Sequence, residues 1–328
     1  MTRRITLVLS LALLGSCTPS RSVTHFRGAT MGTSYSIKVV LLQDGDRSRA
    51  RTAIDTTLAE FDLLFSTYNK NSEISRFNAY RSPTPFLASQ PFADLVRRAL
   101  KLAERTGGAF DPTVGPLARL YGFGPGAKDP GVPPTKAAIA VVREATGWQR
   151  LKVEGLQISK QAPKVELDLN AIAKGAGVDA VSRTLDELGS SSYMVEIGGE
   201  VRCRGSKPDG VLWRLGISQP GGSDFVDKVD LRNAAMATSG SYLQFKQLGS
   251  TKVHHILDPR TGQNSDSKVV SVTVIAPSCA LADGLATALM VLGPDRGEKV
   301  LAASDLRSVK VLYLLAGDSG IEQRSVRW

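Results

Sequence analysis

Ala280-Leu-Ala-Asp283-Gly-Leu-Ala-Thr287-Ala-Leu-Met-Val-Leu292 is the stretch that decides how this chain folds and where its chemistry lies. All of its residues are apolar or small apart from Asp283 and Thr287, which predicts a helix buried inside the domain. These two polar residues are four positions apart, so both side chains leave the helix on one face. A carboxylate in such surroundings loses its hydration unless a positive group compensates it.

A hard cation is one group that would compensate Asp283, because such ions take oxygen ligands from carboxylates, hydroxyls, carbonyls and phosphates. Two other interpretations of the same residues stay open at this point. Asp283 and Thr287 would face solvent if the helix lay at the surface. Asp283 would instead be a capping residue if the helix began later than Ala280.

A second segment, Asp168-Leu-Asn-Ala171-Ile-Ala-Lys174-Gly175, is predicted to be the end of a strand that leads into a helix over residues 171–188. Asp168 stands where a capping residue would. Lys174 falls in the first turn, where its positive charge opposes the helix dipole, so an anionic ligand would relieve that conflict.

Three further segments are rich in polar groups and glycine and lie next to predicted strands. Glu196-Ile-Gly198-Gly199-Glu200 permits close approach of the backbone to a flat ring or a phosphate, although a plain hairpin turn explains it equally well. Thr238-Ser-Gly240 and the segment from His255 to Gly262 are interpreted as turns. His255 would serve as a base near neutral pH, or it is an ordinary solvated histidine.

The rest of the chain alternates helix and strand patterns without a regular βαβ rhythm, which predicts the α+β class. Apolar spacing predicts helices at residues 49–65, 92–105, 171–188 and 280–292. Strands are predicted at residues 35–39, 151–153, 156–159, 193–197, 212–217, 255–257, 269–276 and 309–315, with one more apolar strand that ends at 168–169. Residues 121–134 are dense in glycine and proline, which predicts a long loop.

Composition excludes several function classes for these 328 residues. The formal net charge is +10, but the basic residues are scattered and lack an aromatic-rich binding motif, so nucleic acid is not an expected partner. The glycine loops that bind phosphates and dinucleotides are missing, and three histidines without a GxSxG segment argue against a serine hydrolase. Cys203 and Cys279 lack the spacing of a zinc site and are expected to be two buried thiols, although an extracytoplasmic compartment would also permit a disulfide between them.

The first seventeen residues predict export from the cytoplasm. Arg3 and Arg4 precede an apolar run that is too short to span a bilayer, and small residues follow just before Cys17. This pattern resembles the bacterial lipoprotein box, in which the cysteine becomes the acylated N-terminus and palmitate inserts into the membrane. An ordinary signal peptide with a chance cysteine is the alternative.

The lipoprotein interpretation gives an expected organisation of the whole chain. It consists of a signal peptide over residues 1–16, a lipid-anchored tether over 17–26 and a catalytic domain over 27–328. The domain would then be held at a bacterial cell membrane on its periplasmic, or otherwise extracytoplasmic, side.

Taken together and in this order, the segments resemble the ApbE family of FAD:protein FMN transferases. The resemblance runs from about Gly28 to Gly293. It is carried by eight separated motifs, namely Met31-Gly-Thr33, Ser66-Thr-Tyr68 with Ser72 to Asn78, Ala109 to Pro116, Asp168 to Gly175, Glu196 to Glu200, Ala237 to Gly240, His255 to Gly262 and Ala282 to Thr287.

The resemblance implies a fold and a reaction. A T-fold-like arrangement of mixed sheets packed with helices would hold FAD in a cleft between subdomains. Family members use Mg²⁺ to cleave the FAD diphosphate and join the FMN phosphate to a threonine or serine hydroxyl of an acceptor protein, releasing AMP. The acceptor is expected to be a subunit of a membrane electron-transfer complex or a flavin-carrying periplasmic protein.

The resemblance also implies roles for individual residues. Mg²⁺ would be held by side-chain oxygens of Asp283 and Thr287 and by the carbonyl of Ala171, so Asp283 would act in catalysis through the metal. His255 would lie near the diphosphate, and either His255 or Asp258 would accept the proton of the attacking hydroxyl. The FAD site would be lined by Met31, Tyr68, Ala109, Phe110, Asp111, Asp168 and Lys174, together with His255.

Two residues depart from the family pattern: Gly284, a conservative change where the motif often has alanine, and Ser241. Many relatives carry an aspartate after the Ser-Gly pair, whereas Ser241 follows Gly240 here. The missing carboxylate would change the metal affinity or the balance between transfer and hydrolysis. Two alternative functions therefore stay open: an FAD pyrophosphatase that yields FMN and AMP, and a lipoprotein that binds FAD without turnover.

Overall fold

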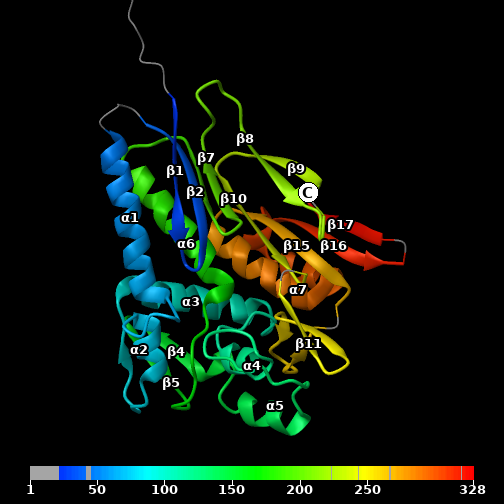
Figure 1. Ribbon diagram of the computed structural model, residues 1–328. Coiled ribbons are helices and arrows are strands. Elements are labelled where there is room, and N and C mark those ends of the chain that lie inside the picture. Colours follow the sequence, from blue (N-terminus) through cyan, green and yellow to red (C-terminus); the bar gives the residue numbers. More distant parts are fainter. Residues whose placement is uncertain (1–21, 42–45, 223, 243, 266, 319) are drawn as a thin grey trace, which may run out of the picture.

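A large antiparallel sheet forms the centre of the molecule (Figure 1). The structure is a computed structural model that describes residues 22–41, 46–222, 224–242, 244–265, 267–318 and 320–328. The eight strands of the sheet lie side by side in the order β1 (Val23–Thr30), β2 (Thr33–Val40), β6 (Tyr193–Ile197), β7 (Glu200–Arg204), β10 (Ala234–Gly240), β15 (Val269–Ala276), β16 (Lys310–Gly317) and β17 (Gly320–Val326). Each neighbouring pair is antiparallel.

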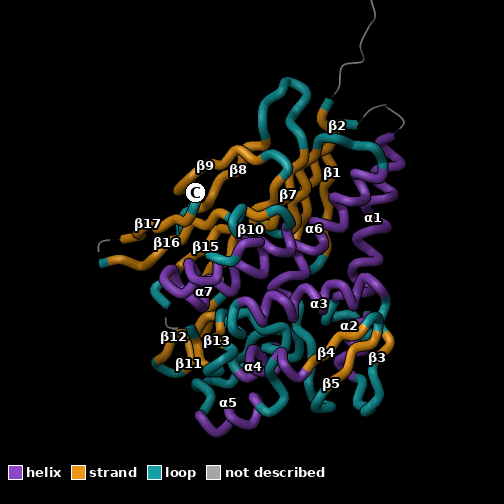
Figure 2. Tube along the Cα trace, turned by 180° about the vertical axis from the view of Figure 1, so that it is seen from behind, coloured by secondary structure: helices purple, strands orange, loops and turns teal. Residues whose placement is uncertain are grey.

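Three helices cover one face of this sheet, as Figures 1 and 2 show from opposite sides. They are α1 (Asp46–Phe65), α6 (Asn170–Glu187) and α7 (Cys279–Leu301). Ile54 of α1 and Val181 of α6 pack with Ile37 of β2 in one buried cluster. Leu289 of α7 packs against Val274 of β15 in a second cluster. The apolar faces that the sequence pattern predicts are therefore turned toward the sheet.

The other face of the sheet is covered by a two-stranded ribbon, β8 (Trp213–Ser218) and β9 (Phe225–Leu231). Trp213 is 1% exposed and packs with Cys203 of β7 and Leu312 of β16. At the chain end, Trp328 Nε1 donates a hydrogen bond to Asp227 Oδ2 of β9, 2.7 Å away. Because both faces are covered, β6 shows a nearly continuous buried run instead of strict alternation.

Below the large sheet in Figure 1 lies a region of short helices and ribbons. The apolar core runs without interruption from this region into the helix layer, because Phe92 and Phe110 belong to the same buried cluster as Leu285 of α7. Its elements are α2 (Glu73–Ala79), β3 (Phe86–Leu87), α3 (Gln90–Arg105), α4 (Gly115–Leu120), α5 (Lys136–Arg143), β4 (Leu151–Glu154), β5 (Gln157–Lys160), β11 (Phe245–Leu248), β12 (Thr251–His254), β13 (Leu257–Asp258) and β14 (Gln263–Asn264). Two short 3₁₀ helices complete the described elements, Trp148–Arg150 and Ser304–Leu306.

The α+β class and most of the predicted elements are confirmed. The helices predicted at residues 49–65, 92–105 and 171–188 correspond to α1, α3 and α6, and residues 121–134 form a loop. The predicted helix at 280–292 is the first part of α7, which is broken at Gly293 (φ 69°) just before Pro294. Such a break is expected because proline cannot continue the hydrogen-bond ladder of the preceding turn. Cys203 and Cys279 are both buried and free, as predicted.

The predicted apolar strand that ends at Asp168-Leu169 is wrong. Residues 161–169 belong to no strand, although Val165 and Leu167 are buried. The backbone of Leu167 is paired with the side chain of Asn78, through bonds of 2.7 and 2.8 Å, and Asp168 N donates to the carbonyl of Pro112. A side chain and a loop carbonyl thus satisfy the groups that a sheet would otherwise satisfy.

Three other boundaries differ from the sequence predictions. Thr238 to Gly240 form no turn but the end of β10, paired with β15. The predicted strand at 255–257 is interrupted, because β12 ends at His254 and β13 begins at Leu257. The large sheet begins at Val23, so residues 23–26, predicted to be tether, pair with β2.

The predicted signal peptide and the acylated Cys17 lie outside the described residues. Over the described residues, no helix combines the length and apolarity needed to cross a bilayer.

Candidate active site

Asp283 sits in the middle of the contact between α6 and α7. Its side chain is 3% exposed, and Oδ2 accepts a hydrogen bond of 2.9 Å from the backbone N–H of Gly175. A Cβ at Gly175 would lie 2.4 Å from the carbonyl oxygen of Cys279, so only glycine allows the two helices to approach this closely. The helix begins at Cys279, after the N-cap Ser278. Asp283 is therefore an internal, buried carboxylate, and both the surface and the capping interpretations are excluded.

Lys174 and Glu200 complete a charged cluster around Asp283. Lys174 Nζ lies 2.5 Å from Oε1 of Glu200, the first residue of β7, which is 2% exposed. The turn between β6 and β7 contacts the lysine stem, since a Cβ at Gly198 would lie 3.3 Å from Lys174 Cδ and 2.8 Å from Thr33 Cγ2. Gly198 has φ 60°, which glycine adopts without strain. Three motifs that are far apart in the sequence thus meet at one place.

Electrostatics couples these three side chains. Burial and the charge of Asp283 raise the pKa of Glu200 to about 7. Burial also raises the pKa of Asp283, against the opposing effects of Lys174 and the Gly175 N–H. Burial acts to lower the pKa of Lys174, but the two carboxylates outweigh it and raise that pKa. With both carboxylates ionised, the cluster has more negative than positive charge, which favours an additional cation.

Oxygen donors suitable for a hard cation converge beside Asp283. Thr287 lies one turn further along α7, and its Oγ1 is 3.2 Å from Ser239 Oγ of β10. The N–H of Gly175 is the donor that a regular helix pairs with the carbonyl of Ala171, so its bond to Asp283 competes with that pairing. Among the described residues, no cluster of three His, Cys, Asp or Glu side chains suits a metal. One carboxylate, one hydroxyl and one carbonyl therefore fit a hard ion that takes its remaining ligands from a bound phosphate or water.

His255 lies between β12 and β13 and has the geometry of a proton acceptor. Its Nδ1 is 3.1 Å from the carbonyl oxygen of Gln244. A carbonyl can only accept, so Nδ1 carries the hydrogen and Nε2 keeps a free lone pair. Burial, and to a smaller extent the charge of Lys174, lower the pKa of His255, so the ring is neutral near pH 7. Because the charge of Lys174 affects the pKa of His255, the histidine lies within electrostatic range of the charged cluster.

Asp258, the other predicted proton acceptor, is occupied by Arg260. Arg260 donates from Nε to Oδ1 over 2.8 Å and from Nη2 to Oδ2 over 2.7 Å. Burial acts to raise the pKa of Asp258, but the hydrogen bonds from Arg260 outweigh it and lower that pKa. A carboxylate held in this way is a weak base, so the geometry favours His255 over Asp258.

Met31 packs on α6 and lines an open groove. It occupies the turn between β1 and β2 with φ 49°, an uncommon value for a residue other than glycine. A Cβ at Gly177 of α6 would lie 2.4 Å from Met31 Cε, so the methionine packs directly on that helix. The groove has a volume of about 640 Å³ and is lined by Met31, Tyr35 and residues of α1 such as Arg51 and Asp55. The predicted cleft between subdomains stays a prediction, because both walls of this groove belong to the layers of the large sheet.

The other predicted FAD-lining residues divide into two kinds. Tyr68, in the loop after α1, is 78% exposed, so its ring is available to a ligand. Ala109 and Phe110 are 1% and 2% exposed, so they can offer only backbone groups. Both carboxylate oxygens of Asp111 are hydrogen-bonded within the protein. Its Oδ1 accepts hydrogen bonds from the backbone N–H and the hydroxyl of Thr113, and its Oδ2 accepts one from the backbone N–H of Trp148. These three residues hold the loop in shape and present no free side-chain atom.

Asp168 precedes α6 and supports its first turn. Its Oδ1 accepts a hydrogen bond of 3.0 Å from Asn170 N, although the N-cap position itself is occupied by Leu169. Burial raises its pKa. Gly115 lies against it, since a Cβ there would be 3.1 Å from Asp168 Cβ. Asp168 therefore fixes the N-terminus of the helix that carries Ala171 and Lys174.

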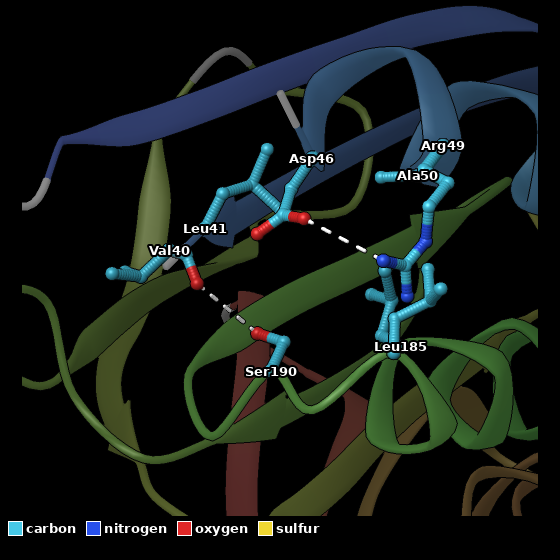
Figure 3. A pocket seen from close by; sticks show the side chains of 8 residues that line it. Val40, Leu41, Asp46, Arg49, Ala50, Leu185 and Ser190 are labelled. Carbon is cyan, nitrogen blue, oxygen red and sulfur yellow. Dashed lines mark hydrogen bonds and ion pairs between the residues drawn. The ribbon is translucent and has the colours of Figure 1, made fainter. Parts of the chain in front are cut away.

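A smaller pocket lies between the start of α1 and the end of α6 (Figure 3). Asp46 pairs there with Arg49, and Ser190 Oγ donates to the carbonyl of Val40. Its volume of about 10 Å³ has room for one water molecule at most. None of the residues of the charged cluster lines it, so we assign no ligand to it.

Sequence reasoning missed several residues of the site. It included Glu200 only as part of a glycine turn, and it gave Ser239 and Gln244 no role. Glu200 opens β7, whose sequence Glu-Val-Arg-Cys-Arg alternates polar and apolar residues, so no local pattern marks this glutamate as buried. The contacts of Ser239 and Gln244 depend on strand pairing that no local pattern reveals.

Two solved structures that are similar to this one are flavin transferases. One from Vibrio cholerae is 42% identical, has a TM-score of 0.85 and covers 94% of this chain and 98% of its own. The apo flavinyl transferase of Pseudomonas stutzeri is 34% identical, has a TM-score of 0.84 and covers 94% of this chain and 95% of its own.

The sequence comparisons agree with the structural ones. An FAD:protein FMN transferase of Vibrio cholerae is 42% identical over 96% of this chain and 94% of its own length. A protein of the same name from Haemophilus influenzae is 36% identical over 98% of this chain and 94% of its own length. The ApbE family profile matches residues 31–312. This chain belongs to the ApbE family.

Proposed function

We propose that this protein transfers the FMN moiety of FAD to a threonine or serine hydroxyl of an acceptor protein, forming a phosphoester bond and releasing AMP. The relatives named FAD:protein FMN transferase support this activity at high coverage. The structural observation that carries it is Asp283, a buried carboxylate fastened to the first turns of α6 and flanked by Lys174 and Thr287. This arrangement joins a cation site to a helix N-terminus, where phosphate groups are stabilised.

The proposal includes Mg²⁺ as the cation. Asp283 and Thr287 would hold it through side-chain oxygens and Ala171 through its carbonyl, a sparse set that suits an ion sharing its shell with phosphate oxygens. When bound, Mg²⁺ supplies neutralisation of the charge on the diphosphate and on the leaving AMP.

The remaining work is assigned to residues of the chain itself. Lys174 binds diphosphate oxygens with its ammonium group. Met31 contacts the ring system at the groove, whose volume of about 640 Å³ lies in the range of small-molecule sites. Tyr68 offers its exposed ring from the loop after α1. His255 takes the proton of the incoming hydroxyl at Nε2, and its hydrogen bond to Gln244 keeps that nitrogen unprotonated. Positioning and charge neutralisation then account for most of the catalysis.

An acceptor-labelling assay tests the proposal. The protein is incubated with FAD, Mg²⁺ and a flavin-acceptor domain, and the products are identified by mass spectrometry. An FMN-sized adduct on a threonine or serine is the expected result. Free FMN with AMP would instead indicate a pyrophosphatase, and unchanged FAD would indicate a flavin-storing protein.

The pyrophosphatase alternative has one specific observation behind it. Ser241 stands where many relatives carry an aspartate, and its N–H and hydroxyl both bond to the carbonyl of Val270, at 3.0 and 3.4 Å. The site therefore has one carboxylate fewer near the metal donors. The ratio of adduct to free FMN, compared between the wild type and Ser241→Asp, measures the effect of this difference on water attack.

The proposal extends to the membrane. A signal peptide over residues 1–16 and acylation of Cys17 would anchor the domain on the extracytoplasmic side, next to membrane or periplasmic electron-transfer subunits that serve as acceptors. Replacement Cys17→Ser is expected to release the protein from washed membranes. Retention of this variant in the membrane fraction would refute the anchor and leave the transfer chemistry untouched.

A further inference from the structure

Glu200 has no role in the mechanism described above, although it is among the most deeply buried charged groups of the site. Its side chain is 2% exposed, and Oε1 pairs with Lys174 Nζ at 2.5 Å. We infer that Glu200 is a positioning residue that holds the Lys174 ammonium beside Asp283, ready for the diphosphate of the substrate. This inference rests on the proposed function, because it takes a flavin dinucleotide as the ligand.

The β6–β7 hairpin approaches the lysine side chain at two points, Cδ and Nζ. Gly198 lies against the lysine stem, close to Cδ, and Glu200 binds the tip. Both residues come from one tight turn, whose glycines Gly198 and Gly199 have φ 60° and 100°. A lysine is a flexible chain with rotatable donors, so a fixed partner is needed to point its charge in one direction.

The second oxygen of Glu200 points to a ligand. Oε2 is buried and has no hydrogen-bond partner among the described residues. A buried acceptor without a donor is costly, and a purely structural ion pair has no need of one. An open acceptor can receive a donor that arrives with the ligand, such as a hydroxyl group or a water molecule, while the paired ammonium of Lys174 faces the anionic diphosphate.

The competing explanation is that the ion pair of Lys174 and Glu200 is structural and only links the hairpin to α6. Comparing the binding of two flavins, with and without phosphate, distinguishes this explanation from the positioning role. The full chain in detergent is titrated with FAD and with riboflavin, which has the same ring system but no phosphate. EDTA is present to prevent turnover, and quenching of flavin fluorescence gives the dissociation constants. The matched control is Glu196→Gln in the same hairpin, whose carboxylate accepts the Gly199 N–H at 2.8 Å.

Glu200→Gln is expected to weaken FAD binding about tenfold, as for loss of one oriented charge contact, and riboflavin binding by less than about twofold. Glu196→Gln is expected to change neither. In a Lys174→Met background, Glu200→Gln is expected to have little further effect on FAD, because both changes remove the same contact. Glu200→Asp, whose carboxylate is one methylene short of Nζ, gives a second test with the charge retained and is expected to show the same selective loss.

Three results would overturn the inference. Glu200→Gln could weaken the binding of FAD and of riboflavin equally, or it could leave FAD binding unchanged or tighter. In the third, Glu200→Gln would weaken FAD binding in the Lys174→Met background by the same factor as in the wild type. The wild-type transfer assay keeps this outcome separate from the proposed function. If the wild type forms the FMN adduct and the flavin titrations fail as described, only the role of Glu200 is refuted. If the wild type forms no adduct, the proposed function itself fails.

Discussion

The contact between α6 and α7 contains two buried aspartates that differ in how their charge is satisfied. Asp179 of α6 is 3% exposed; it accepts the N–H groups of Cys279 and Ala280 at 3.0 Å each and pairs with Arg202 at 2.5 Å. Asp283 of α7 is equally buried, but within the described part of the chain it accepts a hydrogen bond from Gly175 N alone.

The two aspartates exchange bonds across the same pair of helices, yet only one has capacity left for a ligand. Asp179 caps the start of α7 and has a guanidinium partner, so its oxygens are committed. Asp283 has a single backbone donor and the nearby charge of Lys174. Burial alone therefore does not mark a functional carboxylate, and the number of donors that the protein supplies distinguishes the two roles.

The largest expected effect comes from Asp283→Ala, which removes the aspartate proposed as a metal ligand. Loss of the metal ligand is expected to lower the rate of FMN transfer at least about a thousandfold, since charge neutralisation dominates phosphoryl transfer. The melting temperature is expected to stay close to that of the wild type, because burial disfavours the ionised carboxylate. Mass spectrometry of the acceptor and thermal denaturation measure the two quantities. Transfer at an undiminished rate would contradict the assignment.

The second largest effect is expected at His255. It tests whether the catalytic groups around Asp283 include this histidine, which is bonded to Gln244. Replacement His255→Gln is expected to slow transfer about a hundredfold, the usual contribution of a general base. In the wild type, the rate should rise with pH through the His255 pKa, which lies below 6.5, because the neutral ring is the active form. His254→Gln is the control on the adjacent residue. A pH profile that keeps this rise in His255→Gln would refute the role.

Asp179→Ala tests the structural half of the comparison. It leaves Arg202 without its partner and two helix N–H groups without an acceptor, so a loss of about 3 kcal/mol in the free energy of unfolding is expected. The control Asp94→Ala, on α3, removes an exposed pair with Arg97 and is expected to cost less than about 1 kcal/mol. Urea denaturation gives both values. Folded Asp179→Ala should still bind FAD, and selective loss of binding without loss of stability would reverse the two roles.

The smallest expected effect is that of Gly175→Ala, which lies between the two aspartates. The added Cβ would meet the Cys279 carbonyl at 2.4 Å, so the helices must separate at a cost of about 1 to 3 kcal/mol. Both regions should respond, with lower stability and weaker FAD binding together. Gly222→Ala, where the nearest atom is 3.5 Å away, is the control. Unchanged FAD binding in Gly175→Ala would show that the helix spacing does not matter to the site.

The sequence predicted α1, α3, α6 and the first part of α7 because their signal is local, but it did not predict the shorter helices α2, α4 and α5. Ile54 and Leu58 of α1, and the apolar run of α7, repeat with the helical period and are buried as that period requires. It failed for residues 161–169, where an apolar run suggested a strand. Leu167 is buried there without a sheet, since its backbone pairs with Asn78, which is 89 residues away in the chain.

The candidate site follows the same division. That Asp283 and Thr287 share one face of a helix follows from their spacing, and the motif order identified the family. The ion pair of Lys174 with Glu200, the bond from Gly175 to Asp283 and the partnership of Asp258 with Arg260 could not be read from any local pattern. The pair of Lys174 with Glu200 and the bond from Gly175 to Asp283 link residues on separate elements. Asp258 and Arg260 are neighbours in one turn, where both side chains could equally have been solvated.

The sequence by itself determined the long helices α1, α3, α6 and the first part of α7, the apolar face that each carries, and that one acidic residue lies within an apolar stretch. These properties depend on residues within a few positions of each other. Only the tertiary structure decided which donors reach each buried carboxylate, and therefore that Asp179 is committed while Asp283 and Glu200 keep open oxygens. The physical reason is that satisfaction of a buried charge depends on distances of a few ångströms between elements that the sheet topology brings together.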